Sequence, residues 1–141
     1  MSHPADAGCI FCKIIAGTIP SYKLYESDQV FSFLDVGPLS RGHALIIPKG
    51  HWATLDLVPD EVVADCSIVV KKIGSAIAKH TGMQGWNVLQ NNGAVAGQVV
   101  MHVHFHAIPR SEGDGLGFRW PAGKLDKDDA MKLVDAVKSA M

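Results

Sequence analysis

The sequence predicts an α+β domain built on a mainly antiparallel sheet. The chain of 141 residues has the length of about one domain. Short strand-like runs flank one long helical pattern, in the order helix, strands, long helix, strands, helix. No repeat, low-complexity tract or change of composition divides the chain. We therefore expect a flexible tail over residues 1–8 and a single domain over residues 9–141.

The first half of the chain begins with a helix and continues with strands. Residues 9–17 place apolar side chains on one helical face and end at a glycine, which suits the left-handed conformation that closes a helix. Strands are expected over residues 23–26 and 30–34, on either side of a tight turn. A short apolar strand over residues 43–48 follows a loop dense in glycine and proline.

The second half contains the clearest helix. Residues 59–80 open with proline and two acids, which favour a helix N-terminus, and carry apolar residues at intervals of three and four. Residues 86–91 and 99–108 are expected to be strands, the second because its residues alternate strictly between two faces. After a glycine-rich loop, residues 126–140 form a last helix with an aspartate N-cap.

Composition excludes several functional classes. The formal net charge of −1 lacks the basic excess of a dedicated nucleic-acid binder. No apolar run has the ~18 residues of a membrane span, and the first residues lack a secretory signal. Three cysteines are too few for a disulfide framework, which indicates a reducing compartment. We expect a cytoplasmic protein, and the sequence leaves entry into a nucleus open.

Three histidines stand at alternating positions, His102, His104 and His106. In a strand, residues two apart point to the same face, about 6.6–7 Å from each other. We therefore expect three imidazoles on one side of one strand, with the residues between them facing the core. Such a row suits metal binding or phosphate chemistry, and the plain alternative is a solvated polar face.

A loop just upstream supplies amide groups. Asn91 and Gln98 can donate and accept hydrogen bonds, and Gly97 lets a backbone N–H approach a ligand closely. Amide donors beside a nucleophile would stabilise charge that develops on a phosphoryl oxygen. Taken alone, the same loop is an ordinary turn.

Several motifs together resemble one known family. The run His-Val-His-Phe-His-Ala-Ile from His102, preceded by Gly-Gln, resembles the motif of the histidine triad (HIT) family. The opening Cys-Ile-Phe-Cys-Lys-Ile-Ile-Ala-Gly-Thr-Ile-Pro from Cys9 is similar to the histidine triad nucleotide-binding protein branch. Phe-Leu-Asp from Phe33 and the stretch from Gly42 to His51 match as well, so the resemblance spans about residues 9–120.

This resemblance implies a fold and a chemistry. The fold is a five-stranded antiparallel sheet with a long helix and a short N-terminal helix, in a two-fold homodimer with a continuous sheet. The activity is hydrolysis or transfer at the α-phosphate of a purine nucleotide, foremost of nucleoside 5′-phosphoramidates. His104 would attack phosphorus, His102 would orient the triad or serve a metal, and His106 and His43 would bind the α-phosphate. No magnesium is expected to be obligatory, and neither membrane nor nucleic-acid partners are expected.

The resemblance also assigns the substrate contacts. Asn91, Gly97 and Gln98 would hold the phosphate, and Asp35 would bond the ribose hydroxyls. The base would lie in an apolar slot formed by Ile10, Phe11, Ile14, Ile19, Phe33 and Val36. Without the family resemblance, these apolar residues would be interpreted as ordinary core residues and Asp35 as a turn residue.

Two positions bear on substrate choice. Val99 replaces a hydroxyl residue that many branch members carry two positions after the glycine, which puts the leaving-group preference in question. Trp120 matches a position where the C-terminal segment approaches the partner's active site. Residues 111–141 are therefore expected to be the variable part of the domain that selects the substrate.

A metal site is predicted around Cys9 and Cys12. His51 and His102 match the positions that complete a zinc site in some family members, and two thiolates with two imidazoles form a closed structural set. A redox dithiol and two unliganded cysteines are the alternatives.

Two further functions remain as alternatives to phosphoramidate hydrolysis. One is hydrolysis of dinucleoside polyphosphates, although the N-terminal motif belongs to the other branch. The second is a nucleotide-binding adaptor or sensor with incidental turnover, against which the intact His104 argues.

Overall fold

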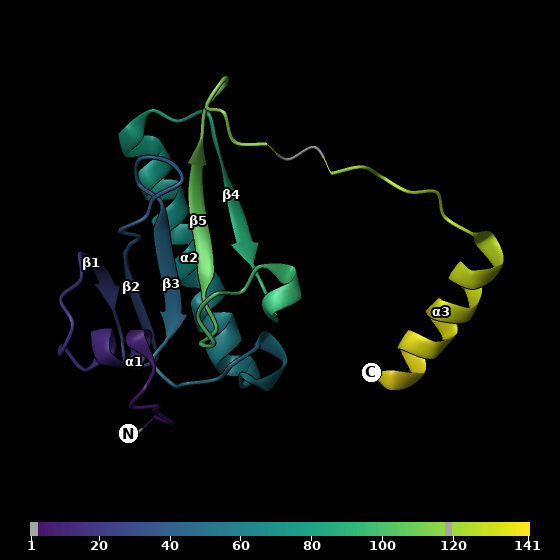
Figure 1. Cartoon of the computed structure of the whole chain (residues 1–141), viewed down its shortest axis with the longest axis horizontal. Coiled ribbons are helices and arrows are strands. Elements are labelled where there is room, and N and C mark those ends of the chain that lie inside the picture. Colours follow the sequence, from purple (N-terminus) through teal and green to yellow (C-terminus); the bar gives the residue numbers. More distant parts are fainter. Residues whose placement is uncertain (1–2, 118–119) are drawn as a thin grey trace.

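A five-stranded antiparallel sheet forms the centre of the protein (Figure 1). The computed structural model describes residues 3–117 and 120–141. The strands are β1 (Lys23–Glu26), β2 (Val30–Leu34), β3 (Ala44–Pro48), β4 (Gly85–Gln90) and β5 (Phe105–Arg110). Their order across the sheet is β1-β2-β3-β5-β4, which places β5 in the interior and β4 at an edge. The predicted α+β class is confirmed.

The two faces of the sheet have separate cores because strand residues alternate between faces. Helix α2 (Asp60–Thr81) covers one face, where Ile46 and Phe105 pack with Val62 and Val69 of the helix. The short helix α1 (Ile10–Ile15) covers part of the other face, where Phe11 and Ile14 pack with the opposite side of β2 and β3. The strands β2 and β3 are therefore buried on both faces.

The ends of the helices lie close to the positions predicted from the sequence. Gly17 after α1 and Gly82 after α2 have φ angles of 79° and 70°, the left-handed conformation expected where a helix stops. Two short 3-10 turns, η1 (Leu55–Leu57) and η2 (Ala94–Ala96), interrupt the loops. The last helix, α3 (Lys127–Ala140), begins at Asp126, whose carboxylate accepts the N–H of Asp129 at 2.8 Å.

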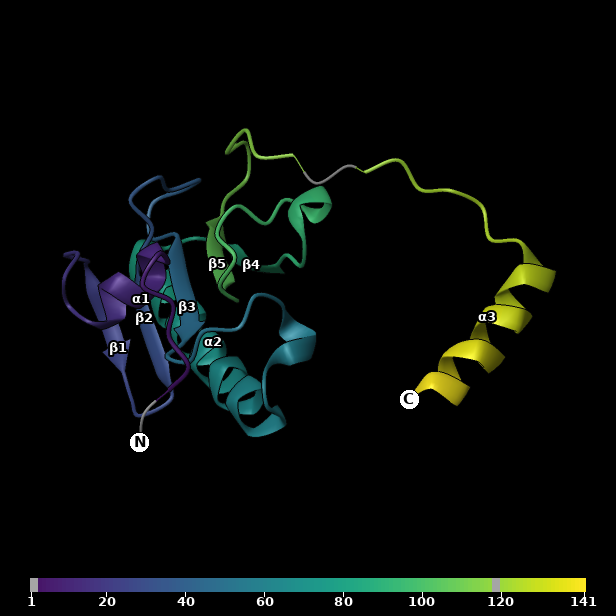
Figure 2. The same ribbon diagram turned by 60° about the horizontal axis from the view of Figure 1, so that its bottom comes forward.

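Helix α3 stands apart from the sheet (Figures 1 and 2). It contains no buried residue, and Leu133, Val134 and Val137 on it are each about half exposed. These side chains lie at the spacing of one helical face. The segment expected to vary and to select the substrate therefore ends in an amphipathic helix that projects past the β4 edge.

The predicted strand over residues 99–108 is wrong at both ends. Strand β5 begins at Phe105, so His102 and His104 lie in an irregular segment before it. The N–H of Val103 bonds to the Trp52 carbonyl at 2.8 Å instead of to a neighbouring strand. Alternation alone does not distinguish an extended loop from a strand. The expectation of three imidazoles on one strand is therefore wrong: His102 and His104 lie in an irregular segment, and only His106 lies on β5.

Strand β5 also continues through Pro109, where a loop was expected. Proline lacks the N–H that a central strand donates. The pairing of β5 with β3 covers only residues 105–107, whereas its pairing with β4 extends to Arg110. Pro109 therefore lies where β5 has a partner on one side, and a missing donor is tolerated there.

The N-terminal segment lies along the first turn of α1. The Pro4 carbonyl accepts the N–H of His51 at 2.7 Å, and the Asp6 N–H points to the Cys12 sulfur at 3.5 Å. Residues 3–8 are mostly exposed, and the flexibility expected for residues 1–8 stays a prediction. Among residues 3–117 and 120–141, no helix combines the length and apolarity needed to cross a lipid bilayer.

Candidate active site and metal cluster

Two imidazoles and a carboxylate meet at one end of the sheet, on the face that α1 covers. His43 immediately precedes β3, Asp35 immediately follows β2, and His106 lies on β5 opposite Leu45. The His43 Nε2 atom is 2.9 Å from His106 Nδ1 and 3.7 Å from an Asp35 carboxylate oxygen. We refer to Asp35, His43 and His106 as the imidazole relay.

Backbone contacts fix the protons of the relay. The Leu39 N–H donates to His43 Nδ1 at 3.1 Å, so the neutral His43 ring carries its proton on Nε2. That Nε2–H donates to His106 Nδ1, which leaves a proton on His106 Nε2. Burial lowers the pKa of His43 and lowers the pKa of His106 to about 4, where the nearby imidazoles add to the shift. The relay therefore presents a neutral N–H donor at physiological pH.

His104 lies beside the relay with one nitrogen occupied. Its Nδ1–H donates to the His102 carbonyl at 2.7 Å, so the neutral ring has its lone pair on Nε2. The ring centroids of His104 and His106 are 4.9 Å apart, and the edge contact with Phe11 is at 5.2 Å. His104 is buried, which lowers its pKa and keeps the imidazole neutral. A neutral imidazole with a fixed lone pair is a competent nucleophile.

The relay is a poor metal site although its three donor atoms lie within 4.8 Å of one another. A metal would need the lone pair of His43 Nε2, but the Leu39 N–H makes Nδ1 the acceptor and Nε2 the donor. The chemistry of these atoms is that of hydrogen bonding to an anion.

The loop from Asn91 to Val99 follows β4, whose last residue, Gln90, pairs with Phe105 directly after His104. The Asn91 amide contacts the Gly97 carbonyl at 3.4 Å, and Gly97 has a φ of 92°. The Gln98 side chain is buried, donates to the Ala53 carbonyl at 2.6 Å and accepts the Gly93 N–H at 2.7 Å. Gln98 thus fastens the loop from within. Val99 is 89% exposed, free of any core role.

The residues expected to line the base slot fall into two groups. Phe11, Ile14 and Phe33 are buried in the core on the α1 face, with Ile19 packed against it. Ile10 and Val36 are exposed. Trp120 is exposed as well and belongs to the segment that leads away to α3. Of the residues expected to line the slot, Phe11 contacts the His104 ring.

A second cluster joins four metal-binding side chains. Cys9, Cys12, His51 and His102 place one ligand atom each within 4.8 Å of one another. His102 Nδ1 is 3.5 and 3.6 Å from the Cys9 and Cys12 sulfurs and 3.3 Å from His51 Nδ1. His102 Nε2 donates to the Pro48 carbonyl at 2.9 Å, which leaves Nδ1 as the lone pair that faces the sulfurs. We refer to these four residues as the thiol–imidazole cluster.

The distances in this cluster fit a tetrahedral zinc ion. Zinc bonds of ~2.05 Å to nitrogen and ~2.3 Å to sulfur give edges of about 3.3 Å between two nitrogens and about 3.6 Å between nitrogen and sulfur. The corresponding separations here are 3.3 Å and 3.5–3.6 Å. Burial lowers the pKa of His102 to about 4, so the ring is available as a neutral ligand.

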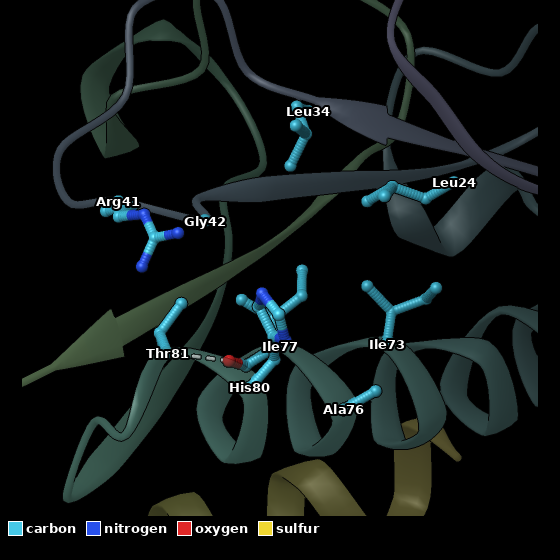
Figure 3. Close-up of a pocket in the computed structure, with 9 residues that line it drawn as sticks. All are labelled: Leu24, Leu34, Arg41, Gly42, Ile73, Ala76, Ile77, His80 and Thr81. Carbon is cyan, nitrogen blue, oxygen red and sulfur yellow. Dashed lines mark hydrogen bonds between the residues drawn. The ribbon is translucent and has the colours of Figure 1, made fainter.

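One cavity reaches the thiol–imidazole cluster, and another lies apart from all of the predicted site residues. One of about 450 Å³ reaches Cys9 and His51 of the thiol–imidazole cluster and has Ile10, Val99 and Met101 in its wall. Another of about 360 Å³ lies between α2 and the β1–β2 end of the sheet. The close-up shows its residues, Leu24, Leu34, Arg41, Gly42, Ile73, Ala76, Ile77, His80 and Thr81 (Figure 3). This apolar groove contains none of the predicted site residues.

The groups that sequence reasoning missed are mainly backbone atoms. The carbonyls of Pro48 and His102 and the N–H of Leu39 decide which nitrogen of each histidine is free. No side-chain motif marks such atoms. The breaker residues around Leu39 and the proline that ends β3 indicated loops there, without indicating which ring each loop would face.

Comparison with known proteins places this arrangement in a family. The profile of the HIT domain matches residues 16–113. The chain is 48% identical to adenosine 5′-monophosphoramidase HNT1 of Candida albicans, over 97% of this chain and 93% of the relative. It is 50% identical to adenylylsulfatase HINT3 of Arabidopsis thaliana, over 92% of this chain and 68% of the relative. The protein belongs to the HIT family.

Solved structures agree with this assignment. The crystal structure of a histidine triad nucleotide-binding protein from Candida albicans matches with a TM-score of 0.85 at 47% identity, covering 94% of this chain and 96% of the other. A Zn-bound histidine triad family protein from Mycobacterium smegmatis matches with a TM-score of 0.74 at 35% identity, covering 95% and 98%. The HIT-like fold expected from the motifs is thereby confirmed.

Proposed function

We propose that this protein hydrolyses purine nucleoside 5′-phosphoramidates to the nucleoside monophosphate and an amine. The observation that carries the proposal is the Nδ1–H···O contact from His104 to the His102 carbonyl at 2.7 Å, which leaves Nε2 as a nucleophile beside the imidazole relay. The name of the Candida albicans relative supports an adenosine monophosphoramidate as substrate.

The reaction proceeds in two displacements. His104 Nε2 attacks the α-phosphorus, the P–N bond to the amine breaks, and the amine leaves with a proton taken from solvent. The nucleotidyl group is then carried on His104 until water attacks phosphorus, gives up a proton to solvent and releases free imidazole. His106 Nε2–H, with His43 behind it, donates to a phosphoryl oxygen, and Asn91 and the Gly97 backbone hold the phosphate from the loop side.

The nucleoside lies on the α1 side of the phosphate. The ribose hydroxyls are assigned to the Asp35 carboxylate, which can accept from both of them. The Gly37 N–H orients this carboxylate through one oxygen at 2.8 Å, and the other oxygen lies 3.7 Å from His43 Nε2. The base packs in the slot of Phe11 and the other apolar residues named for it, with Ile10 and Val36 at its open rim.

The test is steady-state hydrolysis of adenosine 5′-phosphoramidate beside a diadenosine polyphosphate, with wild type and His104→Ala. We expect turnover of the phosphoramidate that vanishes in the variant. Turnover of the polyphosphate alone would move the assignment to that class. Firm AMP binding with no turnover of either compound would favour an adaptor or sensor.

The name of the Arabidopsis thaliana relative favours a second substrate, adenosine 5′-phosphosulfate. The same attack by His104 would expel sulfate instead of an amine. Val99 bears no hydroxyl, so it offers no donor to either leaving group. Adding this substrate to the same assay ranks the two leaving groups by kcat/KM.

The thiol–imidazole cluster is proposed to bind one structural zinc ion. Support comes from the tetrahedral spacing of its donors and from the Zn-bound relative. When bound, zinc would link Cys9 and Cys12 at the start of α1 to His51 and His102 beside the sheet. Metal analysis of the purified protein should give one zinc per chain, and Cys12→Ala should abolish it.

A two-fold homodimer is proposed through the β4 edge. Strand β4 pairs with β5 and lies at the sheet edge, with Val88 on it 51% exposed, and an unprotected edge favours pairing with a second copy. Such a dimer would extend the sheet and let the Trp120 segment reach the partner's site. Light scattering after size exclusion should give twice the chain mass, and Val88→Lys should reduce it.

A further inference from the structure

His102 belongs to the thiol–imidazole cluster through its ring and to the catalytic site through its backbone. The ring is fully buried, with Nδ1 facing the two sulfurs and Nε2–H on the Pro48 carbonyl at 2.9 Å. The carbonyl oxygen of the same residue accepts His104 Nδ1–H at 2.7 Å. One residue therefore contacts both the metal ligands and the ring proposed to attack phosphorus.

We infer that His102 is a positioning residue, through which metal bound in the thiol–imidazole cluster holds His104 with its Nε2 lone pair toward the substrate. A metal on His102 Nδ1, together with the contact to Pro48, would clamp the ring at both ends. The main chain at residue 102, and with it the carbonyl that orients His104, would then be held in place.

The peptide unit that carries this carbonyl has one hydrogen-bonded anchor besides the His102 ring, the Val103 N–H, and Val103 is buried in the core on the α2 face. Residues 99–104 precede β5, and the cross-links named for them are the Val103 N–H on Trp52 and the Gln98 side chain on the Val100 carbonyl. In a paired strand the ladder would hold such a carbonyl on its own. Here the Val103 N–H and the ring of His102 together take the place of the ladder, so how firmly the carbonyl is held depends in part on what the ring binds.

The cluster is also open to exchange. The cavity of about 450 Å³ reaches Cys9 and His51, so a metal ion or chelator can approach these two ligands from solvent through a wall that includes Ile10 and Val99 of the proposed substrate site. The occupancy of the metal would therefore set the fraction of molecules in which His104 is correctly oriented. The kinetic part of this inference rests on the proposed hydrolase function, whereas the structural part does not.

The test compares the full-length protein loaded with zinc and stripped by a chelator, with ¹⁵N-labelled histidine. With zinc we expect a sharp, slowly exchanging Nδ1–H signal from His104, assigned by its loss in His104→Ala. Without zinc we expect that signal to broaden, kcat to fall about tenfold and KM to stay within about twofold. Added zinc should restore both the signal and kcat.

Two thiol variants provide a matched pair. Cys12→Ala should behave as the stripped protein even in excess zinc, whereas Cys66→Ala, which removes a buried thiol in the α2 core, should keep the wild-type signal and kcat. If Cys12→Ala does not fold, the stripped wild type, checked by far-UV circular dichroism, decides alone.

Three results would overturn the inference. A stripped, folded protein that keeps both the His104 signal and its kcat would show that the metal does not position the ring. Equal effects of the two thiol variants would do the same. If removal of the metal by the chelator unfolds the whole protein, the metal has a purely structural role. If the zinc-loaded protein lacks phosphoramidate hydrolysis, the proposed function fails, and the imidazole signal still decides the role of His102.

Discussion

The thiol–imidazole cluster and the imidazole relay both contain histidines, but the imidazole rings do different chemistry in each. In the first, the Pro48 carbonyl accepts a hydrogen bond from His102 Nε2–H, which leaves the Nδ1 lone pair facing two sulfurs. In the second, an N–H next to His43 occupies Nδ1 and turns the Nε2 proton toward His106. The backbone group beside an imidazole thus decides whether the ring is a ligand or a donor.

The largest effect is expected for His104→Ala. The variant removes the lone pair that attacks phosphorus and leaves the relay in place, so kcat should fall by at least about 10³-fold while AMP affinity stays within about threefold. His80→Ala, an exposed histidine at the end of α2, is the control and should match wild type. Residual turnover within tenfold of wild type would remove His104 from the mechanism.

The next effect is on stability as the pH falls. The pKa of His106 is about 4 in the folded protein and about 6.5 in the unfolded chain, so the unfolded state binds more protons between these values. The free energy of unfolding is therefore highest above pH ~6.5, and it decreases as the pH falls toward 4, by up to about 3 kcal/mol.

The measurement is urea unfolding of the zinc-saturated protein at several pH values. His106→Asn should have a flatter pH dependence than wild type, because its side chain does not titrate. His80→Ala should keep the wild-type slope. Parallel curves for His106→Asn and wild type would show that the relay is not held neutral by burial.

Much of the fold follows from the sequence, and the part that does not is instructive. Gly82 and the period of α2 predict that helix almost to the residue, because a helix end and an apolar stripe are local features. The residues of both clusters were also named from motifs. The predicted start of β5 was wrong because the alternating pattern continues through the irregular segment that holds His102 and His104. Which carbonyl or N–H each ring meets depends on Pro48 and Leu39, which are distant or unmarked in the sequence.

A smaller effect is expected for Asp35→Asn, which keeps the acceptor for the Gly37 N–H and removes the carboxylate charge. AMP should bind about tenfold more weakly, because two ribose hydroxyls lose an anionic acceptor. The matching nucleotide without either hydroxyl should bind the variant and wild type alike, by isothermal titration calorimetry. Equal losses for both ligands would place Asp35 outside the ribose contact.

The smallest effect concerns Phe11, whose ring contacts His102 of the thiol–imidazole cluster and also His104 beside the relay. Its ring meets His102 edge-on at 5.8 Å and His104 at 5.2 Å between centroids. Phe11→Leu keeps most of the apolar volume and loses both ring contacts, at a cost of about 1 kcal/mol in the free energy of unfolding.

Phe31→Leu is the matched control for this variant. Phe31 is 5% exposed in the same core as Phe11, at 6%, and its ring packs on Phe33 rather than on a histidine. Both variants should lose similar stability in urea, but only Phe11→Leu should lower kcat, by about threefold, since only it loosens the His104 ring. An equal fall of kcat in both would mean that the core as a whole orients His104, and that Phe11 is one part of it among others.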